Sequence, residues 1–169
     1  AYDNLADIYV KEDKQKAINL LKAFVNQNPR GFWVSHVFSK LSDLSTNLDS
    51  SLYYLNKAIN TDETKDIWLY ERRAEIYMKL GSLEKALEDY TNYIDSSDYK
   101  SAYDYEPRIN VYLKLGQFED ALNDYDAIFK IVGYDGEYLK KAIEICKKEE
   151  LEDRLKSYLS NVSTINELS

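Results

Sequence analysis

Few residues in this sequence could carry out covalent or metal chemistry. The 169 residues include one cysteine, Cys146, and one histidine, His36. One cysteine cannot form an internal disulfide, and the pair provides no zinc-binding cluster. A Ser-His-Asp or Cys-His nucleophile would depend on His36, no glycine-rich elbow accompanies a serine, and phosphate and dinucleotide loops are missing. We therefore expect a protein that is not an enzyme and that binds no metal or cofactor.

Long apolar runs and positive charge are also scarce. No segment approaches the roughly 18 apolar residues that would span a bilayer, so membrane insertion is not expected. The 30 Asp and Glu residues outnumber the 22 Lys and Arg residues, for a net charge of −8, and 84–126 alone holds 11 acids against 4 bases. Binding to nucleic acid draws its energy from a basic surface, so a nucleic-acid partner is not expected.

The most informative stretch, 68–94, reads as two helices separated by a turn. Apolar residues recur at helical spacing in each half, so each segment has one apolar face. They are Tyr70, Ala74, Ile76, Tyr77 and Leu80 in the first half, and Leu83, Ala86, Leu87, Tyr90 and Ile94 in the second. Gly81 suits the left-handed residue that ends a helix, and Ser82 can cap the next one. Ala74 and Ala86 are small enough to let the two helices cross closely.

This unit is repeated. A shift of 35 residues places 103–129 on 68–94, and 12 of the 27 aligned positions are identical. The identical pairs include Tyr70 and Tyr105, Arg73 and Arg108, Gly81 and Gly116, Asp89 and Asp124, and Tyr90 and Tyr125. Repeats of this period are typical of solenoids, in which helix pairs stack on one another.

The repeated residues resemble the tetratricopeptide repeat, a 34-residue helix pair. Its first helix carries an aromatic residue, Leu-Gly and Tyr, and its second helix carries Ala and an aromatic residue. The matching positions are Tyr70, Tyr77, Ala86 and Tyr90. Arg73 instead stands where Leu is usual, and Ala74 where Gly is usual. The resemblance implies an all-α fold: a right-handed α-solenoid of antiparallel helix pairs, the superhelix of this family.

About five such hairpins account for nearly the whole chain. They fall at about 1–30, 31–64, 65–98, 99–133 and 134–162, in a single domain over 1–162, with 163–169 as a frayed tail. The second unit keeps the period but carries serines, such as Ser42, where aromatic residues are usual. In the fifth unit Arg154 stands where Ala is expected, and we interpret this pair as a terminal cap with a polar outer face.

Caps and helix breakers predict several helix boundaries. Asp13 is expected to cap a helix over 14–27, and Pro107, which is tolerated only in a first turn, predicts a helix start near Asp104. The last helix is expected to end near 160. Residue 1 falls inside a helix expected at 1–11 and is not Met, so we expect further residues upstream. Any targeting signal could lie there, which leaves the compartment open, with the cytoplasm slightly favoured.

The resemblance also implies a concave groove lined by the first helix of each hairpin. Carrying the register across the repeats assigns to it Trp33, His36, Val37, Lys40, Trp68, Glu71, Arg72, Glu75, Met78, Tyr103, Glu106 and Asn110. Trp33, Trp68 and Tyr103 share one repeat position, and neither Trp is the usual core aromatic residue. Trp and Arg carry much of the binding energy in protein interfaces. The alternative is that the two Trp residues brace neighbouring helices.

We therefore expect a non-catalytic scaffold that binds a peptide or helix of a partner protein in this groove. The alternative is a structural segment of a larger repeat array, or a homo-oligomer, whose repeats form an assembly interface. One branch of the family grips the acidic C-terminal tails of chaperones through a set of Lys, Asn and Arg residues. Only Arg72 matches that set in the first three units, so binding of a chaperone tail is not favoured.

Overall fold

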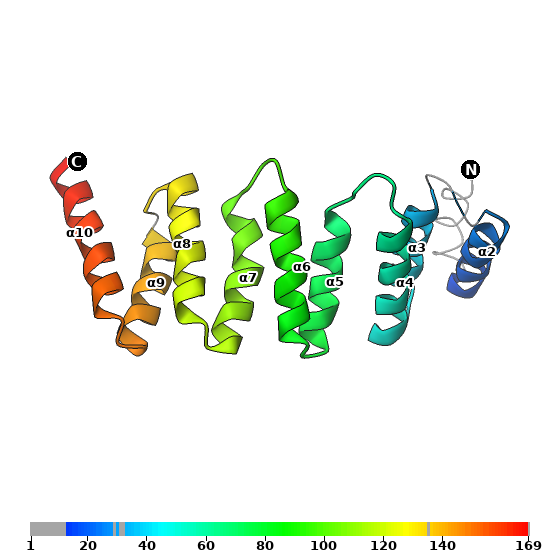
Figure 1. Ribbon diagram of the computed structural model, residues 1–169, viewed down its shortest axis with the longest axis horizontal. Coiled ribbons are helices and arrows are strands. Elements are labelled where there is room, and N and C mark those ends of the chain that lie inside the picture. Colours follow the sequence, from blue (N-terminus) through cyan, green and yellow to red (C-terminus); the bar gives the residue numbers. More distant parts are fainter. Residues whose placement is uncertain (1–12, 29, 31–32, 135, 169) are drawn as a thin grey trace. The chain divides into compact units, whose positions relative to one another are not determined.

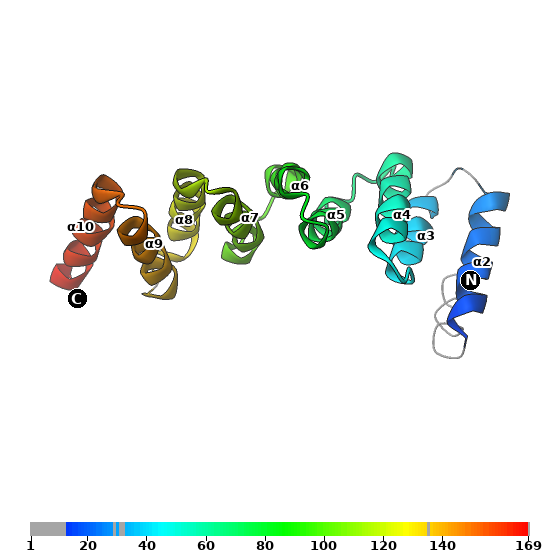
Figure 2. The same cartoon turned by 90° about the horizontal axis from the view of Figure 1, so that it is seen from below.

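The computed structural model describes residues 13–28, 30, 33–134 and 136–168. Within these ranges the fold is all α, with nine helices and no strand, as the sequence predicts. The chain divides into two compact units, Ala1–Ser96 and Ser97–Ser169. Their helices are labelled in Figure 1 and are seen from below in Figure 2. The helix expected at 1–11 lies outside the described residues.

Consecutive helices pair within each unit. The first unit contains α2 (Lys14–Gln27), α3 (Val34–Asp43), α4 (Leu48–Thr61), α5 (Trp68–Lys79) and α6 (Leu83–Ser96). The second contains α7 (Ala102–Leu115), α8 (Phe118–Val132), α9 (Gly136–Lys148) and α10 (Glu152–Leu168). The pairs α3–α4, α5–α6, α7–α8 and α9–α10 form hairpins, and α4–α5 and α8–α9 contacts join successive hairpins. The last helix thus continues past its expected end near 160.

Several helix ends use the caps that the sequence predicts. The Asp13 carboxylate accepts two backbone N–H groups of the first turn of α2, both at 3.1 Å. Gly81 follows α5 with a φ of 73°, and the N–H of the next residue donates to the Tyr77 carbonyl at 2.9 Å. The closure recurs at Gly116, where φ is 72° and the next N–H reaches Tyr112 at 2.9 Å. Glycine fits because it has no Cβ to clash in the left-handed region.

Helix α7 begins two residues earlier than expected. Its start is stabilised by Asp104, whose carboxylate accepts the Ser101 N–H at 2.6 Å and the Ser101 hydroxyl at 3.0 Å. Pro107 therefore lies inside the helix, beyond its first turn. Because proline has no N–H, the Tyr103 carbonyl lacks its usual i+4 donor. Tyr103 itself belongs to the first turn of the helix.

The small residues lie where the sequence predicts close helix contacts. Ala74, Ala86 and Ala121 are fully buried, and Tyr90 and Tyr125 are buried beside them. Burying these rings supplies much of the apolar contact in so thin a helical layer. The Leu80 side chain, expected on the apolar face of α5, is instead exposed because this residue is the C-cap of the helix.

An arginine and an aspartate join the two helices of each central hairpin. Arg73 of α5 donates Nε and Nη2 to the two carboxylate oxygens of Asp89 on α6, both at 2.7 Å. Arg108 makes the same two bonds to Asp124, at 2.9 and 2.6 Å, between α7 and α8. Both aspartates are buried, and the Asp89 bonds raise the Arg73 pKa. The Arg that departs from the family pattern is therefore half of a paired motif.

Tyrosine rings flank each guanidinium. Arg73 lies 5.8 Å from the ring centroids of both Tyr70 and Tyr77. At the next repeat, Arg108 lies 5.9 and 5.8 Å from the equivalent rings. Bidentate ion pairing and contact with aromatic faces both suit the planar guanidinium, so lysine could not replace it equally well.

The second hairpin joins its helices differently. Phe38 and Tyr54 occupy the positions of the Arg–Asp pair and stack, with ring centroids 6.4 Å apart. Ser42 and Ser51 each donate a hydroxyl hydrogen bond to the other's backbone carbonyl, at 2.9 and 3.0 Å. These reciprocal bonds hold α3 against α4, so the loss of the usual aromatic residues is compensated locally.

In the last hairpin, Arg154 reaches from α10 back to α8. Its Nη1 donates to Asp126 at 2.8 Å and its Nη2 to Asn123 at 3.1 Å. The buried Tyr158 hydroxyl donates to the same Asp126 carboxylate, also at 2.8 Å. The long Arg154 side chain is accommodated where a small Ala was expected, because its guanidinium contacts the preceding hairpin.

We expect Asp89→Ala to lower the free energy of unfolding by roughly 3 kcal/mol, because it leaves the Arg73 guanidinium partly buried without its carboxylate. The matched double variant Arg73→Phe with Asp89→Tyr copies the Phe38–Tyr54 stack. Its free energy of unfolding should fall less than that of Asp89→Ala. Urea denaturation of the intact chain measures both values. A double variant less stable than Asp89→Ala would contradict the prediction that a Phe–Tyr stack can replace the Arg–Asp ion pair.

Candidate functional site

In the first unit, Trp33 and His36 lie together at the start of α3. Trp33 is 59% exposed, and its ring centroid lies 6.2 Å from that of His36 in an edge-to-face contact. Both line a small hollow of about 170 Å³ with Asp62, Thr64 and other residues of the α4–α5 connection. Aromatic surface is therefore available beside carboxylates at this end of α3.

Trp68, the first residue of α5, is 56% exposed. Its ring packs at 5.3 Å, centroid to centroid, on the buried ring of Tyr93 in α6. One part of the side chain thus braces its own hairpin, while the rest faces solvent. The two interpretations made from the sequence, groove anchor and brace, are both compatible with this placement.

Arg72 is bound within the protein. Its guanidinium donates to the Ser39 hydroxyl and to the Asp43 carboxylate of α3. Burial lowers the pKa of Arg72, and the nearby Glu75 opposes that effect. An acidic partner at this point would have to compete with Asp43. Lys40, one turn before Asp43 on α3, is half-buried.

Glu71 and Glu75 act on one buried tyrosine. Burial raises the pKa of Tyr90 to about 12, and the charges of Glu75 and then Glu71 contribute to the shift. A carboxylate raises the pKa of a neighbouring phenol because two negative charges repel. The inner surface of α5 is therefore electronegative near Tyr90.

In the second unit, Tyr103 and Asn110 are separated along α7. Tyr103 is 77% exposed in the first turn. Asn110 is exposed two turns later and lines a hollow of about 430 Å³, which we call the α7–α9 groove. The groove is lined by Glu106, Ile109, Asn110, Leu113, Tyr125, Tyr138, Lys141, Glu144, Ile145 and Lys148.

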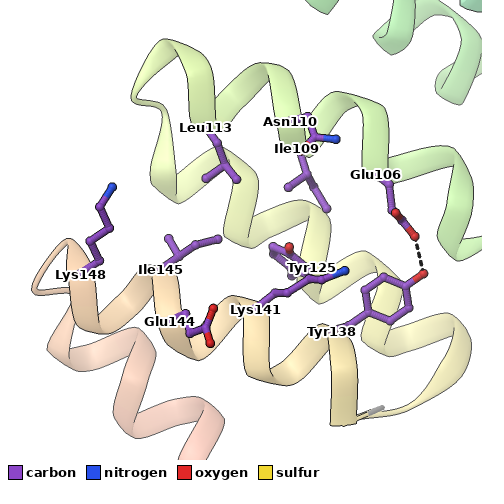
Figure 3. A pocket seen from close by; sticks show the side chains of 10 residues that line it. All are labelled: Glu106, Ile109, Asn110, Leu113, Tyr125, Tyr138, Lys141, Glu144, Ile145 and Lys148. Carbon is purple, nitrogen blue, oxygen red and sulfur yellow. Dashed lines mark hydrogen bonds between the residues drawn. The ribbon is translucent and has the colours of Figure 1, made fainter.

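The groove combines apolar and polar walls. Ile109 and Leu113 of α7 face Ile145 of α9, with the Tyr125 ring of α8 behind them (Figure 3). At one end, Tyr138 donates its hydroxyl to Glu106 at 2.6 Å, and Lys148 stands at the opposite end (Figure 3). An apolar floor with a few polar groups around it is the usual composition of a binding site.

Carboxylates dominate the electrostatics of the α7–α9 groove. Burial raises the pKa of Tyr125 to about 12, and the negative charges of Glu106, Glu137 and Glu144 contribute, in that order. Lys141 lies 3.6 Å from Glu137 and also over the Tyr138 ring, 5.7 Å from its centroid. The pattern around Tyr125 matches that around Tyr90, 35 residues earlier.

Sequence reasoning found only part of this groove. Of the residues assigned to the concave surface from the sequence, Glu106 and Asn110 line the α7–α9 groove, while Tyr103 lies outside the lining. The α9 wall was missed because no residue of the fifth hairpin was assigned to the concave surface. The signal available was that α9, like α7, is the first helix of a hairpin and can present the same inner face.

The described part of the chain has neither a metal-binding cluster nor a membrane-spanning helix. It contains no group of three or more His, Cys, Asp or Glu side chains that could hold a metal ion. Among the same residues, no helix has the length and apolar character to cross a membrane. Cys146 is buried in α9, and burial raises the pKa of its thiol.

We expect Trp68→Ala to cost about 1 to 2 kcal/mol of stability, less than the roughly 3 to 5 kcal/mol of a fully buried Trp, because half of the ring is exposed. Trp33→Ala, which removes a ring in contact with the exposed His36, is the matched control and should cost less. Chemical denaturation measures both. A loss above 3 kcal/mol for Trp68→Ala would show that this residue belongs to the core and is no surface anchor.

The buried tyrosines predict sensitivity to alkali. The folded-state pKa of about 12 for Tyr90 and Tyr125 exceeds the unfolded value of about 10. The two hydroxyls therefore stay protonated to a higher pH in the folded state than in the unfolded state. This stabilisation is complete below about pH 10 and is lost as pH rises towards 12. The free energy of unfolding, measured against pH, should fall less steeply in Tyr90→Phe with Tyr125→Phe. Tyr99→Phe, at a 92% exposed position, should leave the slope unchanged.

Comparison with known proteins identifies the repeat. The family model described as tetratricopeptide repeat matches residues 1–30. No curated protein sequence matches the chain. A crystal structure of a tetratricopeptide repeat protein from Parabacteroides merdae is 22% identical, with a TM-score of 0.74 over 98% of this chain and 67% of that one.

Two further solved structures share the fold. The MamA protein is 17% identical, with a TM-score of 0.71 over 95% of this chain and 87% of that chain. PilF from Pseudomonas aeruginosa is 11% identical, with a TM-score of 0.63 over 96% and 74%. The resemblance to the tetratricopeptide repeat family is therefore confirmed, by the family model at residues 1–30 and by the fold of the described chain.

Proposed function

We propose that this protein is a non-catalytic interaction scaffold that binds a peptide or helix of a partner protein on the first helices of its hairpins. The observation that carries the proposal is the α7–α9 groove, an open hollow of about 430 Å³ with an apolar floor. Its volume lies within the range of roughly 300 to 1,000 Å³ that is common for ligand sites. Several side chains of a peptide could be buried there.

The groove suits recognition of an amphipathic segment. Such a segment buries its apolar side chains in a hydrophobic groove and leaves its polar side chains at the rim. Ile109, Leu113 and Ile145 offer the apolar surface, and Asn110 at the rim can both donate to and accept from a peptide backbone. The proposal requires no reactive group.

We propose that the first unit contributes contacts of a second kind. The exposed portions of Trp33 and Trp68 can anchor apolar groups of a partner, since exposed aromatic residues often become binding hot spots. The other residues proposed for contacts in this unit are His36, Lys40, Glu71, Arg72 and Glu75. Tyr103 is proposed separately, as a contact on α7 of the second unit. Arg72 would take part while keeping its bonds to α3.

Selection of a displayed random-peptide library on the intact chain tests this function. We expect binders whose affinity falls at least tenfold in Asn110→Trp, because an indole would occupy the groove. Asn92→Trp makes the same substitution at an exposed position of α6 outside the groove and should bind as the unchanged chain does. Isothermal titration calorimetry provides the affinities, and circular dichroism checks that both variants fold.

Two results would overturn the proposal. One is a library that yields no binder. The other is a set of binders that Asn110→Trp and Asn92→Trp affect equally. Concentration-dependent self-association in sedimentation experiments, in place of peptide binding, would instead favour an assembly interface.

A further inference from the structure

Building on the proposed function, we propose that the α7–α9 groove recognises a basic amphipathic segment of the partner protein. Apolar side chains of the segment lie on Ile109, Leu113 and Ile145, and a Lys or Arg side chain pairs with Glu106 and Glu144. The charge of the expected partner is therefore opposite to that of an acidic chaperone tail.

The ion pairs of the groove leave its negative charge in excess. Both lysines of the lining have their own carboxylates: Lys141 lies 3.6 Å from Glu137, and Lys148 lies 3.2 Å from Glu149. Among the described residues, neither Glu106 nor Glu144 is within ion-pair distance of a cation. Two carboxylates thus remain for a partner, while each of the two ammonium groups already lies beside a carboxylate.

Glu106 and Glu144 stand on opposite walls. Glu106 projects from α7 and Glu144 from α9, with the apolar floor between the two helices (Figure 3). The protein partner of Glu106 is the uncharged Tyr138 hydroxyl, at 2.6 Å. A carboxylate has four lone-pair sites, so Glu106 can accept from a guanidinium or ammonium while it keeps this bond.

Tyr125 lies close to the same carboxylates. This ring lies at the back of the groove, where burial raises the pKa of its hydroxyl and the carboxylates of Glu106, Glu137 and Glu144 add to the shift. The field of these carboxylates disfavours an incoming carboxylate and attracts a cation. The net charge of −8 on the whole chain would steer a basic partner towards it.

The peptides selected on the intact chain provide the test. We expect them to be enriched in Lys and Arg next to Leu, Ile or Phe. The variant Glu106→Gln with Glu144→Gln should bind them about tenfold more weakly, equivalent to about 1.4 kcal/mol. Higher salt should weaken binding to the unchanged chain more than to this variant, because salt screens the lost pairs.

A matched variant separates groove charge from total charge. Glu88→Gln with Asp120→Asn removes the same two charges from exposed positions of α6 and α8 outside the groove. It should bind the selected peptides within about twofold of the unchanged chain, since distant charges are screened. Glutamine can still accept from Tyr138, so the groove variant should keep its fold, which its melting temperature checks.

The outcomes distinguish this inference from the proposed function. Binders that Asn110→Trp blocks, but that are neutral or acidic and insensitive to Glu106→Gln with Glu144→Gln, would overturn the basic partner and leave groove binding intact. Equal weakening by the groove variant and the matched variant would also overturn it. A library without binders would overturn both.

Discussion

The buried pairing of an arginine with an aspartate across each central hairpin is the interaction on which the rest of this structure depends. Asp89 and Asp124 lie out of solvent, and each would be costly there without the two hydrogen bonds of its guanidinium. The fork geometry determines how the first helix faces the second. It also places the flanking tyrosines and, through them, the inner surface of the hairpin.

Other hairpins meet the same requirement with different chemistry. The second hairpin uses a Phe38–Tyr54 stack and reciprocal serine hydrogen bonds, whereas the last sends Arg154 back to Asp126 on the preceding helix. In each case a contact between helices satisfies polar groups or buries aromatic rings. The repeat therefore tolerates changes of residue type as long as the facing positions change together.

The surfaces around Tyr90 and Tyr125 connect this framework to the proposed binding. Tyr90 and Tyr125 occupy equivalent positions, each buried and each surrounded by glutamates. In the second unit, α9 adds an apolar wall opposite α7 and turns this position into a groove. A partner that brings both apolar surface and positive charge would satisfy the floor and the carboxylates together. This is the basis of the proposed recognition.

The sequence by itself determined the all-α class, the 35-residue step and many helix ends, because helical periodicity, glycine closures and caps act within a few neighbouring residues. It also singled out Arg73 and Arg108 as departures from the family pattern. Only the tertiary structure decided what these arginines bind, that Asp43 already engages Arg72, and that α9 completes a groove with Asn110. Those outcomes depend on contacts between side chains of helices that are far apart in the sequence, and no local sequence pattern determines such contacts.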